Sequence, residues 1–313
     1  MKTIFLLAAA FTVVISSSSA VAASSSGTAL ITGDGTQYHV NNLSEEGSEI
    51  AEFLRFSLDS DNVDNLIFYI HGRGKEPGKS LQKVIPYIEE EYSSSVLMFH
   101  WYPSYKGGIG YPKKEAESAA PALAKAIEYF WEYKKTNGDK FNGIKVTFLV
   151  HSMGNIVFEK FMKGYQEGTL SADLFDTIIL SSPDTDADTH HAWVSKIDFS
   201  ENIYITVNDQ DKMLGVSAKK QLKKRLGQIG GDKAVTIFDS PITLAPNAVY
   251  VDFSETGVNH RYFIKSGQKN NHWINEFYDE VMNGNSVNME QFSGVKEVRE
   301  LGNNNKFYVI KAE

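Results

Sequence analysis

The chain of 313 residues contains no cysteine. This absence excludes disulfide-stapled scaffolds, cysteine nucleophiles, cysteine-ligated zinc and iron–sulfur clusters. A chain of this length can bury enough apolar surface to fold on its hydrophobic core alone. Any nucleophile must therefore be another residue type.

An excess of positive charge is also absent. The chain has 31 Lys and Arg residues against 39 Asp and Glu residues, which gives a formal net charge of −8. This balance argues against non-specific binding of nucleic acid. Nothing in the composition points to a particular protein partner.

The N-terminal apolar run is short. Ile4–Ile15 is too short to span a bilayer comfortably, and it lies between Lys2 and the small residues Ala20–Ala23. A positive charge, a short apolar run and an A-x-A site together form the pattern of a secretory signal peptide. We therefore expect cleavage after Ala22, export to the periplasm or the medium, and no stable membrane span.

From Asn65 onward, strand-like apolar runs alternate with amphipathic helical patterns. This rhythm predicts βαβ units and an α/β fold with a mostly parallel sheet flanked by helices. The predicted strands are Asn65–Ile70, Ser95–His100, Lys145–Val150, Asp176–Ser181, Asn202–Asn208, Val235–Phe238 and Ala248–Phe253. The predicted helices are Lys79–Tyr92, Lys114–Lys134, one beginning at Asn155, Val216–Leu226 and Asn271–Met282.

The two ends of the chain follow other patterns. Thr36–Asn41 and Ile50–Ser57 are further strand candidates before the alternation begins. Beyond Met282, Val295–Leu301 and Lys306–Lys311 flank a Gly-Asn turn, which predicts a C-terminal β-hairpin appended to the main domain.

One junction between a strand and a helix carries a nucleophile pattern. The apolar run Val146–Val150 ends in His151-Ser152-Met153-Gly154, where a helical pattern follows. A buried strand that turns sharply into a helix with Ser at the apex is a nucleophile elbow, which lifts the hydroxyl above the sheet edge. The first glycine of the full G-x-S-x-G pattern is replaced by Val150, so an ordinary strand-to-helix loop stays the alternative.

A serine hydroxyl becomes a good nucleophile only when a base takes its proton and a third group orients that base. In chains with such an elbow, the acid and then the His follow the Ser at the ends of later strands. His260 follows the last predicted strand before the hairpin, so it is the candidate base. Asp209 and Asp211 follow one later strand and Asp184 follows another, and by position alone all three are candidate acids.

Further residues are candidates for the rest of the site. The backbone N–H groups of Met153 and of Arg73 or Gly74 are the candidate oxyanion hole, because they follow the Ser and the first core strand. His71, Tyr102 and His151 are candidates for the pocket wall.

Alternating acidic residues lie at residues 184–188 and at residues 59–61. Neither run continues as a calcium-binding loop, because Thr189 and Asp64 stand where glycine is needed and the closing Glu is missing. We predict no metal site and no cofactor.

Taken in chain order, these motifs resemble the α/β-hydrolase superfamily over roughly residues 62–283, and more closely a bacterial family of esterase/lipase-like hydrolases. The motifs are His71-Gly72, Phe99–Ser104, His151–Asn155, Pro183–Asp186, Asp211–Leu214 and His260–Phe263. The resemblance implies an α/β-hydrolase fold, and it favours Asp211 over Asp209 as the acid.

The sequence therefore predicts a signal peptide at residues 1–22, a segment of edge strands at 23–61, an α/β-hydrolase domain at 62–285 and a hairpin tail at 286–313. The expected function is an exported serine hydrolase that cleaves a small-molecule carboxylic ester through an acyl-enzyme, with Ser152, Asp211 and His260 as triad. The alternative is a non-catalytic secreted binding module of the same fold. The two differ in whether His260 and an Asp reach Ser152.

Overall fold

The computed structural model describes residues 28–32, 37–39, 51, 54, 57–58, 63–73, 79–101, 111–231, 236–237, 240–268, 271–301 and 305–313. The expected signal peptide, the oxyanion candidate Gly74 and the pocket candidate Tyr102 lie outside these residues.

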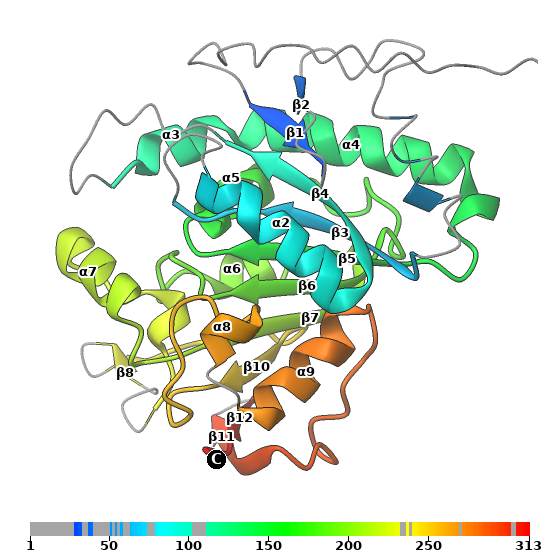
Figure 1. Cartoon of the computed structure of the whole chain (residues 1–313). Helices are drawn as coiled ribbons and strands as arrows, with labels where there is room; N and C mark the ends of the chain where they lie inside the picture. The colour runs from blue at the N-terminus through cyan, green and yellow to red at the C-terminus, as the bar shows by residue number, and fades with distance from the viewer. Residues whose placement is uncertain are drawn as a thin grey trace, which may run out of the picture.

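A ten-stranded sheet runs through the described part of the chain, with the strand order β11-β12-β10-β7-β6-β5-β3-β4-β1-β2 (Figure 1). Its parallel strands are β3 (Asn65–Ile70), β4 (Ser94–His100), β5 (Lys145–His151), β6 (Phe175–Ser181), β7 (Ser200–Val207), β10 (Val249–Asp252) and β12 (Asn305–Ile310). Neighbours from β4 to β12 all pair in parallel. An antiparallel pair of strands lies at each edge of the sheet. At one edge β1 (Ala29–Ile31) pairs with β2 (Gln37–His39), and at the other β11 (Val295–Leu301) pairs with β12. The mostly parallel sheet is confirmed.

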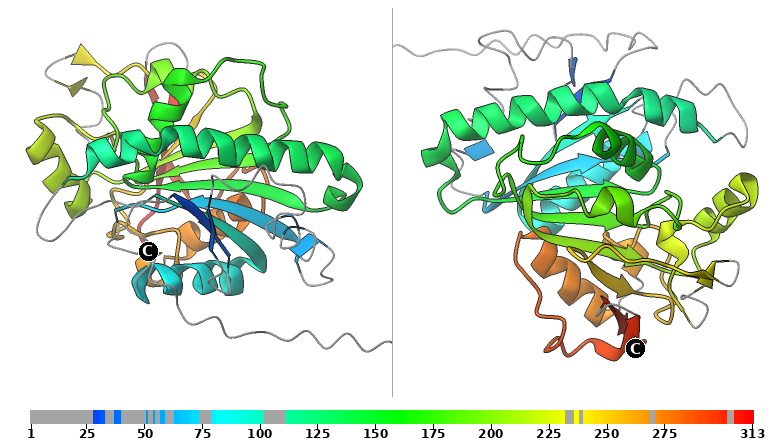
Figure 2. Two further views of the ribbon diagram at one scale, coloured as in Figure 1. Left: turned by 90° about the horizontal axis from the view of Figure 1, so that it is seen from above. Right: turned by 180° about the vertical axis from the view of Figure 1, so that it is seen from behind.

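Helices cover both faces of this sheet (Figure 2). One face carries α3 (Lys113–Ser118), α4 (Ala120–Thr136), α5 (Gly154–Gly164) and α6 (His191–Val194), and the other carries α2 (Lys79–Tyr92), α8 (Lys265–Gln268) and α9 (His272–Met282). Successive residues of a strand point to opposite faces, so Phe68 joins the core under α4 and Tyr69 joins the core under α2. Because both faces are buried, the central strands read as continuous apolar runs.

Two predicted helices have different limits in the structure. The single helix predicted at Lys114–Lys134 is two helices, because the chain turns at Ala119 and Pro121 lies in the first turn of α4. The helix predicted at Val216–Leu226 is α7 (Lys212–Gln221), since Asp211 caps its start and Leu222 ends it with a φ of 52°.

The N-terminal segment differs from its prediction. Ile50–Ser57 was expected as a strand, but its described residues Ala51, Leu54 and Ser57 are helical, as is Leu58. The strand prediction is wrong because the buried residues Leu54 and Leu58 follow the helical repeat of four rather than the alternation of a strand. Strand β2 confirms part of Thr36–Asn41, and β1 was not predicted.

The late strands are only partly described. Of Val235–Phe238, the structure describes Thr236–Ile237, which forms β8 in a separate pair with β9 (Ser240–Pro241).

The C-terminal hairpin is confirmed as a strand pair, and it is built into the main sheet because β12 pairs in parallel with β10. None of the described helices is long and apolar enough to cross a membrane.

Candidate active site

Ser152 lies at a sharp turn between β5 and α5. Its φ is 53°, in the left-handed region that a serine rarely adopts, which is a strained backbone at this position. Val150 stays inside the sheet, in register with Ile70 and Leu180, so the branched side chain does not occupy the strained position. Asn155 stabilises the turn, because its side-chain nitrogen donates to the carbonyl oxygens of Val150 (3.0 Å) and Ser152 (3.1 Å).

Two glycines let the loop after β3 approach this turn. A Cβ on Gly154 would lie 2.8 Å from the carbonyl oxygen of His71 and 2.9 Å from that of Ile70. A Cβ on Gly72 would lie 2.8 Å from the Cβ of Ser152. The close approach of backbone to backbone therefore depends on both glycines.

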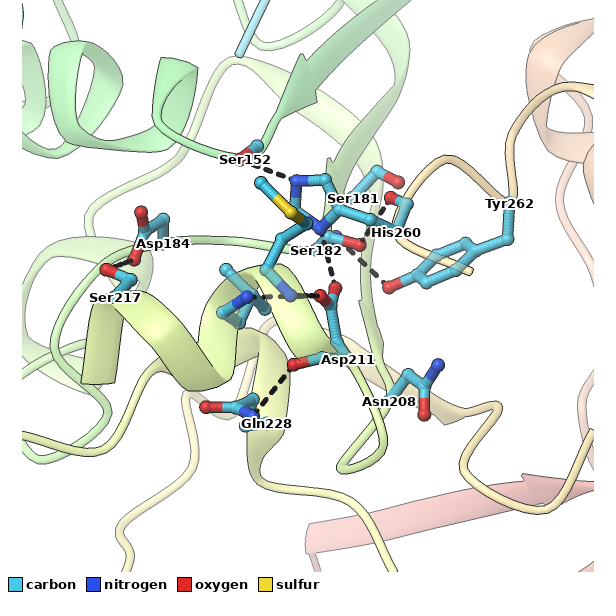
Figure 3. A network of polar contacts seen from close by, with 12 residues as sticks. Ser152, Ser181, Ser182, Asp184, Asn208, Asp211, Ser217, Gln228, His260 and Tyr262 are labelled. Atoms are coloured by element: carbon cyan, nitrogen blue, oxygen red, sulfur yellow. Dashed lines mark hydrogen bonds and ion pairs between the residues drawn. The ribbon is translucent and has the colours of Figure 1, made fainter. Parts of the chain in front are cut away.

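The structure brings Ser152, His260 and Asp211 together from three separate loops (Figure 3). The Nε2 atom of His260 lies 2.8 Å from the hydroxyl oxygen of Ser152, and its Nδ1 atom lies 2.6 Å from Oδ2 of Asp211. An imidazole that donates from Nδ1 to a carboxylate presents an unprotonated Nε2 to the hydroxyl, which suits proton abstraction.

Asp211 is the candidate acid that contacts His260. Its Oδ1 atom accepts hydrogen bonds from the backbone N–H groups of Met213 (2.9 Å) and Leu214 (3.1 Å), so the same carboxylate caps α7. The Asp211 side chain is 0 % exposed. A buried carboxylate held by these donors stays fixed in orientation.

The other two candidate acids lie elsewhere. Asp209 accepts a hydrogen bond from Gln210 (2.7 Å), and its carboxylate lies against Gly231. Asp184 accepts a hydrogen bond at Oδ1 from the Ser217 hydroxyl (2.5 Å), and burial raises its pKa to about 6. Neither carboxylate is hydrogen-bonded to His260 in the described structure.

The loop that carries His260 is held at its main chain. The carbonyl oxygen of His260 accepts from the hydroxyl of Ser182 (3.0 Å), and Nε2 of His151 lies 3.2 Å from the same oxygen. Burial is the main cause that lowers the pKa of His151 well below its usual value, and the electrostatic effect of the neighbouring His260 adds to it. His151 is therefore neutral and serves as a donor to His260 rather than as the base for Ser152.

Sequence reasoning gave no role to Ser182, nor to Tyr262, which was noted only as part of the His260–Phe263 motif. Ser182 follows β6 with a φ of 45°, and its backbone N–H donates to the hydroxyl of Tyr262 (3.2 Å). That hydroxyl donates to the carbonyl oxygen of Thr206 (2.9 Å). The positive φ has no signal in the sequence, because it falls on a serine rather than on glycine or asparagine.

His71 lies behind the cavity instead of in its wall. It is fully buried, its Nδ1 donates to the carbonyl oxygen of Gly72 (2.6 Å), and its Nε2 lies 2.9 Å from Nδ1 of His100. Its backbone carbonyl accepts from the indole of Trp101 (2.8 Å). Burial lowers the pKa of His71 to about 3 and that of His100 to about 4, so both rings are neutral packing groups.

A cavity of about 730 Å³ opens beside Ser152. Its described lining includes Met153 at the start of α5 and Arg73 after β3, the two described residues proposed as backbone donors to an oxyanion. His151 and Asp184 also line it. Among the residues that the structure describes, no group of three or more His, Cys, Asp or Glu side chains could hold a metal ion.

Residues 46–269 match the family described as "Alpha/beta hydrolase of unknown function (DUF900)". A search of curated proteins gave no match. Solved structures similar to this chain include esterase PE8, with 13 % identity, 71 % of this chain and 94 % of that chain covered and a TM-score of 0.39. Another is Thermogutta terrifontis esterase 2 phosphoramylated by tabun, with 11 % identity, coverage of 71 % and 83 % and a TM-score of 0.36. A Pyrobaculum calidifontis esterase has 13 % identity, coverage of 72 % and 77 % and a TM-score of 0.34.

Proposed function

Because the chain belongs to the DUF900 family of α/β hydrolases, we propose that it is an exported serine hydrolase that cleaves carboxylic esters through an acyl-enzyme. The observation that supports this most directly is the pair of hydrogen bonds that joins Ser152 to His260 (2.8 Å) and His260 to Asp211 (2.6 Å). A serine, a histidine and a buried carboxylate in this order are the machinery of nucleophilic acyl transfer.

In the proposed first step, the Ser152 oxygen attacks the ester carbonyl while Nε2 of His260 takes the hydroxyl proton. The Asp211 carboxylate holds Nδ1–H and stabilises the imidazolium that forms. The tetrahedral intermediate collapses as His260 returns the proton to the leaving alcohol, and the acyl group remains on Ser152. Water, deprotonated by His260, then releases the acid.

The negative oxygen of the intermediate needs fixed donors. We assign this role to the backbone N–H of Met153, at the positive end of the α5 dipole, and to the N–H of Arg73 or Gly74. In other enzymes, removal of one such donor lowers kcat by about 10²–10³-fold.

The alternative of a non-catalytic binding module receives less support, because such a protein would not need an oriented imidazole beside a strained serine. Export stays part of the proposal on the signal-peptide pattern at residues 1–22. N-terminal sequencing of the protein secreted by an expression host tests it, with Ala23 as the expected first residue.

The test of the activity is hydrolysis of p-nitrophenyl esters from acetate to dodecanoate, compared between the wild-type chain and Ser152→Ala. We expect turnover by the wild type and a loss of at least about 10³-fold in the variant. Equal rates for the two proteins would remove Ser152 as the nucleophile.

A further inference from the structure

Asn208 directly follows β7, where the chain turns toward Asp211 (Figure 3). It is 1 % exposed. Its backbone carbonyl accepts a hydrogen bond from the N–H of Asp211 (3.1 Å), and its side-chain oxygen accepts one from the N–H of Gln210 (2.9 Å). Its own N–H donates to the carbonyl oxygen of Gly227 (2.8 Å). The turn that carries the candidate acid is therefore folded around this one residue.

The other end of the same amide contacts the loop that carries His260. Nδ2 of Asn208 donates to the carbonyl oxygen of Val258 (3.2 Å), which lies 50 positions later in the chain and directly before Asn259-His260. The orientation of the amide is fixed by its partners, because the backbone N–H of Gln210 can only donate and the backbone carbonyl of Val258 can only accept. One buried amide thus joins the turn of the acid to the loop of the base.

Strand β7 also holds the other side of the loop. The hydroxyl of Tyr262, which follows His260 in the chain, donates to the carbonyl oxygen of Thr206 in β7 (2.9 Å). Thr206 and Asn208 are neighbours at the carboxyl end of this strand, and their hydrogen bonds hold the loop before and after His260. Because the same strand leads directly into Asp211, one piece of backbone positions both the acid and the base.

We propose that Asn208 is a positioning residue, which sets the separation of Asp211 and His260 by fixing the turn of one and the loop of the other. The inference rests on the proposed serine-hydrolase function and adds to that site a residue outside its triad. The contact it maintains joins Oδ2 of Asp211 to Nδ1 of His260 at 2.6 Å. A displacement of about 1 Å in such a contact can lower the rate by about 10²-fold. Loss of the amide should therefore reduce catalysis more than substrate binding.

Asn271 provides a matched control. It begins α9, is 3 % exposed, and makes the same two kinds of hydrogen bond. Its Oδ1 accepts from the backbone N–H of Ile274 (3.0 Å), and its Nδ2 donates to the carbonyl oxygen of Lys311 (3.2 Å). Each asparagine therefore joins a local N–H to a distant carbonyl. A serine at either position keeps an oxygen for the local N–H and is too short to make the long-range bond.

The first readout is ester hydrolysis by Asn208→Ser and Asn271→Ser. In Asn208→Ser we expect kcat to fall about tenfold or more while KM stays within about threefold of the wild-type value. In Asn271→Ser both constants should stay within about twofold of wild type. Urea denaturation of the two variants checks that they lose similar stability, so that a difference in kcat is not a difference in folding.

The second readout needs no substrate. The proton on Nδ1 of His260, held by Asp211, should give a low-field proton NMR signal in the wild type, which His260→Ala identifies by its loss. We expect this signal to broaden or disappear in Asn208→Ser and to keep its position and width in Asn271→Ser. If Asn208→Ser does not fold, Asn208→Asp takes its place, with Asn271→Asp as control, because aspartate keeps the shape and the acceptor oxygen but lacks the donor.

The two proposals fail in different ways. A wild-type kcat or an unchanged Nδ1 proton in the folded Asn208 variant overturns the positioning role and leaves ester hydrolysis intact. Equal losses of kcat in the Asn208 and Asn271 variants also overturn it, because the effect would then be one of general stability. Absence of Ser152-dependent cleavage of every ester overturns the proposed function, and the NMR comparison still decides whether Asn208 positions His260.

Discussion

The Nε2 atom of His151 lies 3.2 Å from the backbone carbonyl oxygen of His260, so the residue before Ser152 holds the loop that carries His260. Their rings are 4.8 Å apart and tilted by 53°, so contact between the two side chains accompanies this hydrogen bond. The turn that presents Ser152 and the loop that presents His260 are thereby joined directly. We therefore expect the distance between Ser152 and His260 to depend on this junction as well as on the hydrogen bond between the two side chains.

His151→Ala removes this donor and leaves the Ser182 hydroxyl as the described side-chain donor to the same carbonyl. We expect kcat for ester hydrolysis to fall about tenfold with a small change in KM, because a loosened His260 affects the reaction more than substrate binding. Steady-state kinetics check this. His151→Gln, which keeps an N–H donor, should recover part of kcat, and a kcat within twofold of wild type in the alanine variant would contradict the positioning role.

Asp211 and Asp209 provide a matched pair of variants. Asp211→Asn should lower kcat by about 10³–10⁴-fold, since the amide no longer selects the tautomer of His260 that presents a free Nε2. Its melting temperature should change little, because asparagine caps a helix about as well as aspartate. Asp209→Asn, two residues away, should keep kcat within a few-fold of wild type. Equal losses in both variants would show that the acid has been misassigned.

Gly154→Ala tests the close approach of the elbow to β3. The added methyl would lie 2.8 Å from the carbonyl oxygen of His71, and overpacking of this kind costs about 1–3 kcal/mol of unfolding free energy. The control is Gly138→Ala, where no atom of the described residues lies within 4 Å of the new Cβ. Urea denaturation of both variants provides the comparison, and the account fails if they are equally stable.

The stability of the protein should fall in mild acid. Burial lowers the pKa values of His71 to about 3 and of His100 and His190 to about 4. In the unfolded chain these rings take up protons near pH 6.5, so below that pH the unfolded state binds protons that the folded state does not. Each ring then removes about 1.4 kcal/mol per pH unit until its folded pKa is reached. Denaturant titrations at pH 7.5, 6.5 and 5.5 measure how steeply the free energy of unfolding falls with pH. His190→Gln should lower the number of protons taken up on unfolding at pH 5.5 by about one.

Asp184 should act with the opposite sign. Its folded pKa of about 6 is above its unfolded value, so its contribution to stability is present in full at low pH and is lost as pH rises through about 6. Relative to wild type, Asp184→Asn should therefore be less stable at pH 5 than at pH 7.5. Parallel stability curves for the two proteins across this range would show that Asp184 is already ionised at pH 5.

The sequence predicted the sheet and the neighbourhood of the site for a common physical reason. Strands buried on both faces are continuous apolar runs, and the carboxyl ends of parallel strands meet at one edge. Ser152, Asp211 and His260 each follow such an end, so chain position alone brought them into consideration. Chain position left Asp211 and Asp209 equal, and the family resemblance favoured Asp211 without giving a physical reason. The described structure supplies the reason, because Asp211 caps α7 with one carboxylate oxygen and contacts the imidazole of His260 with the other.

Other features had no local signal. The positive φ of Ser182 falls on a residue type that rarely adopts it, so the support of His260 from β6 could not be predicted. The C-terminal hairpin was recognisable from its own turn. Its pairing with β10 could not be predicted, because this contact joins strands far apart in the chain and the pattern within the hairpin does not indicate it. At Leu54 and Leu58, a short apolar segment fits either a strand or a helix until its buried partners are known.

The central claim is that His260 and Asp211 activate Ser152 as a nucleophile. Its most direct test is reaction of the full chain with a fluorophosphonate, followed by peptide mass spectrometry. The account predicts a single phosphonate adduct on Ser152 that forms within minutes, at least about 10³-fold more slowly in His260→Ala, and not at all in Ser152→Ala. An unlabelled Ser152, or labelling that proceeds at the same rate without His260, would contradict it.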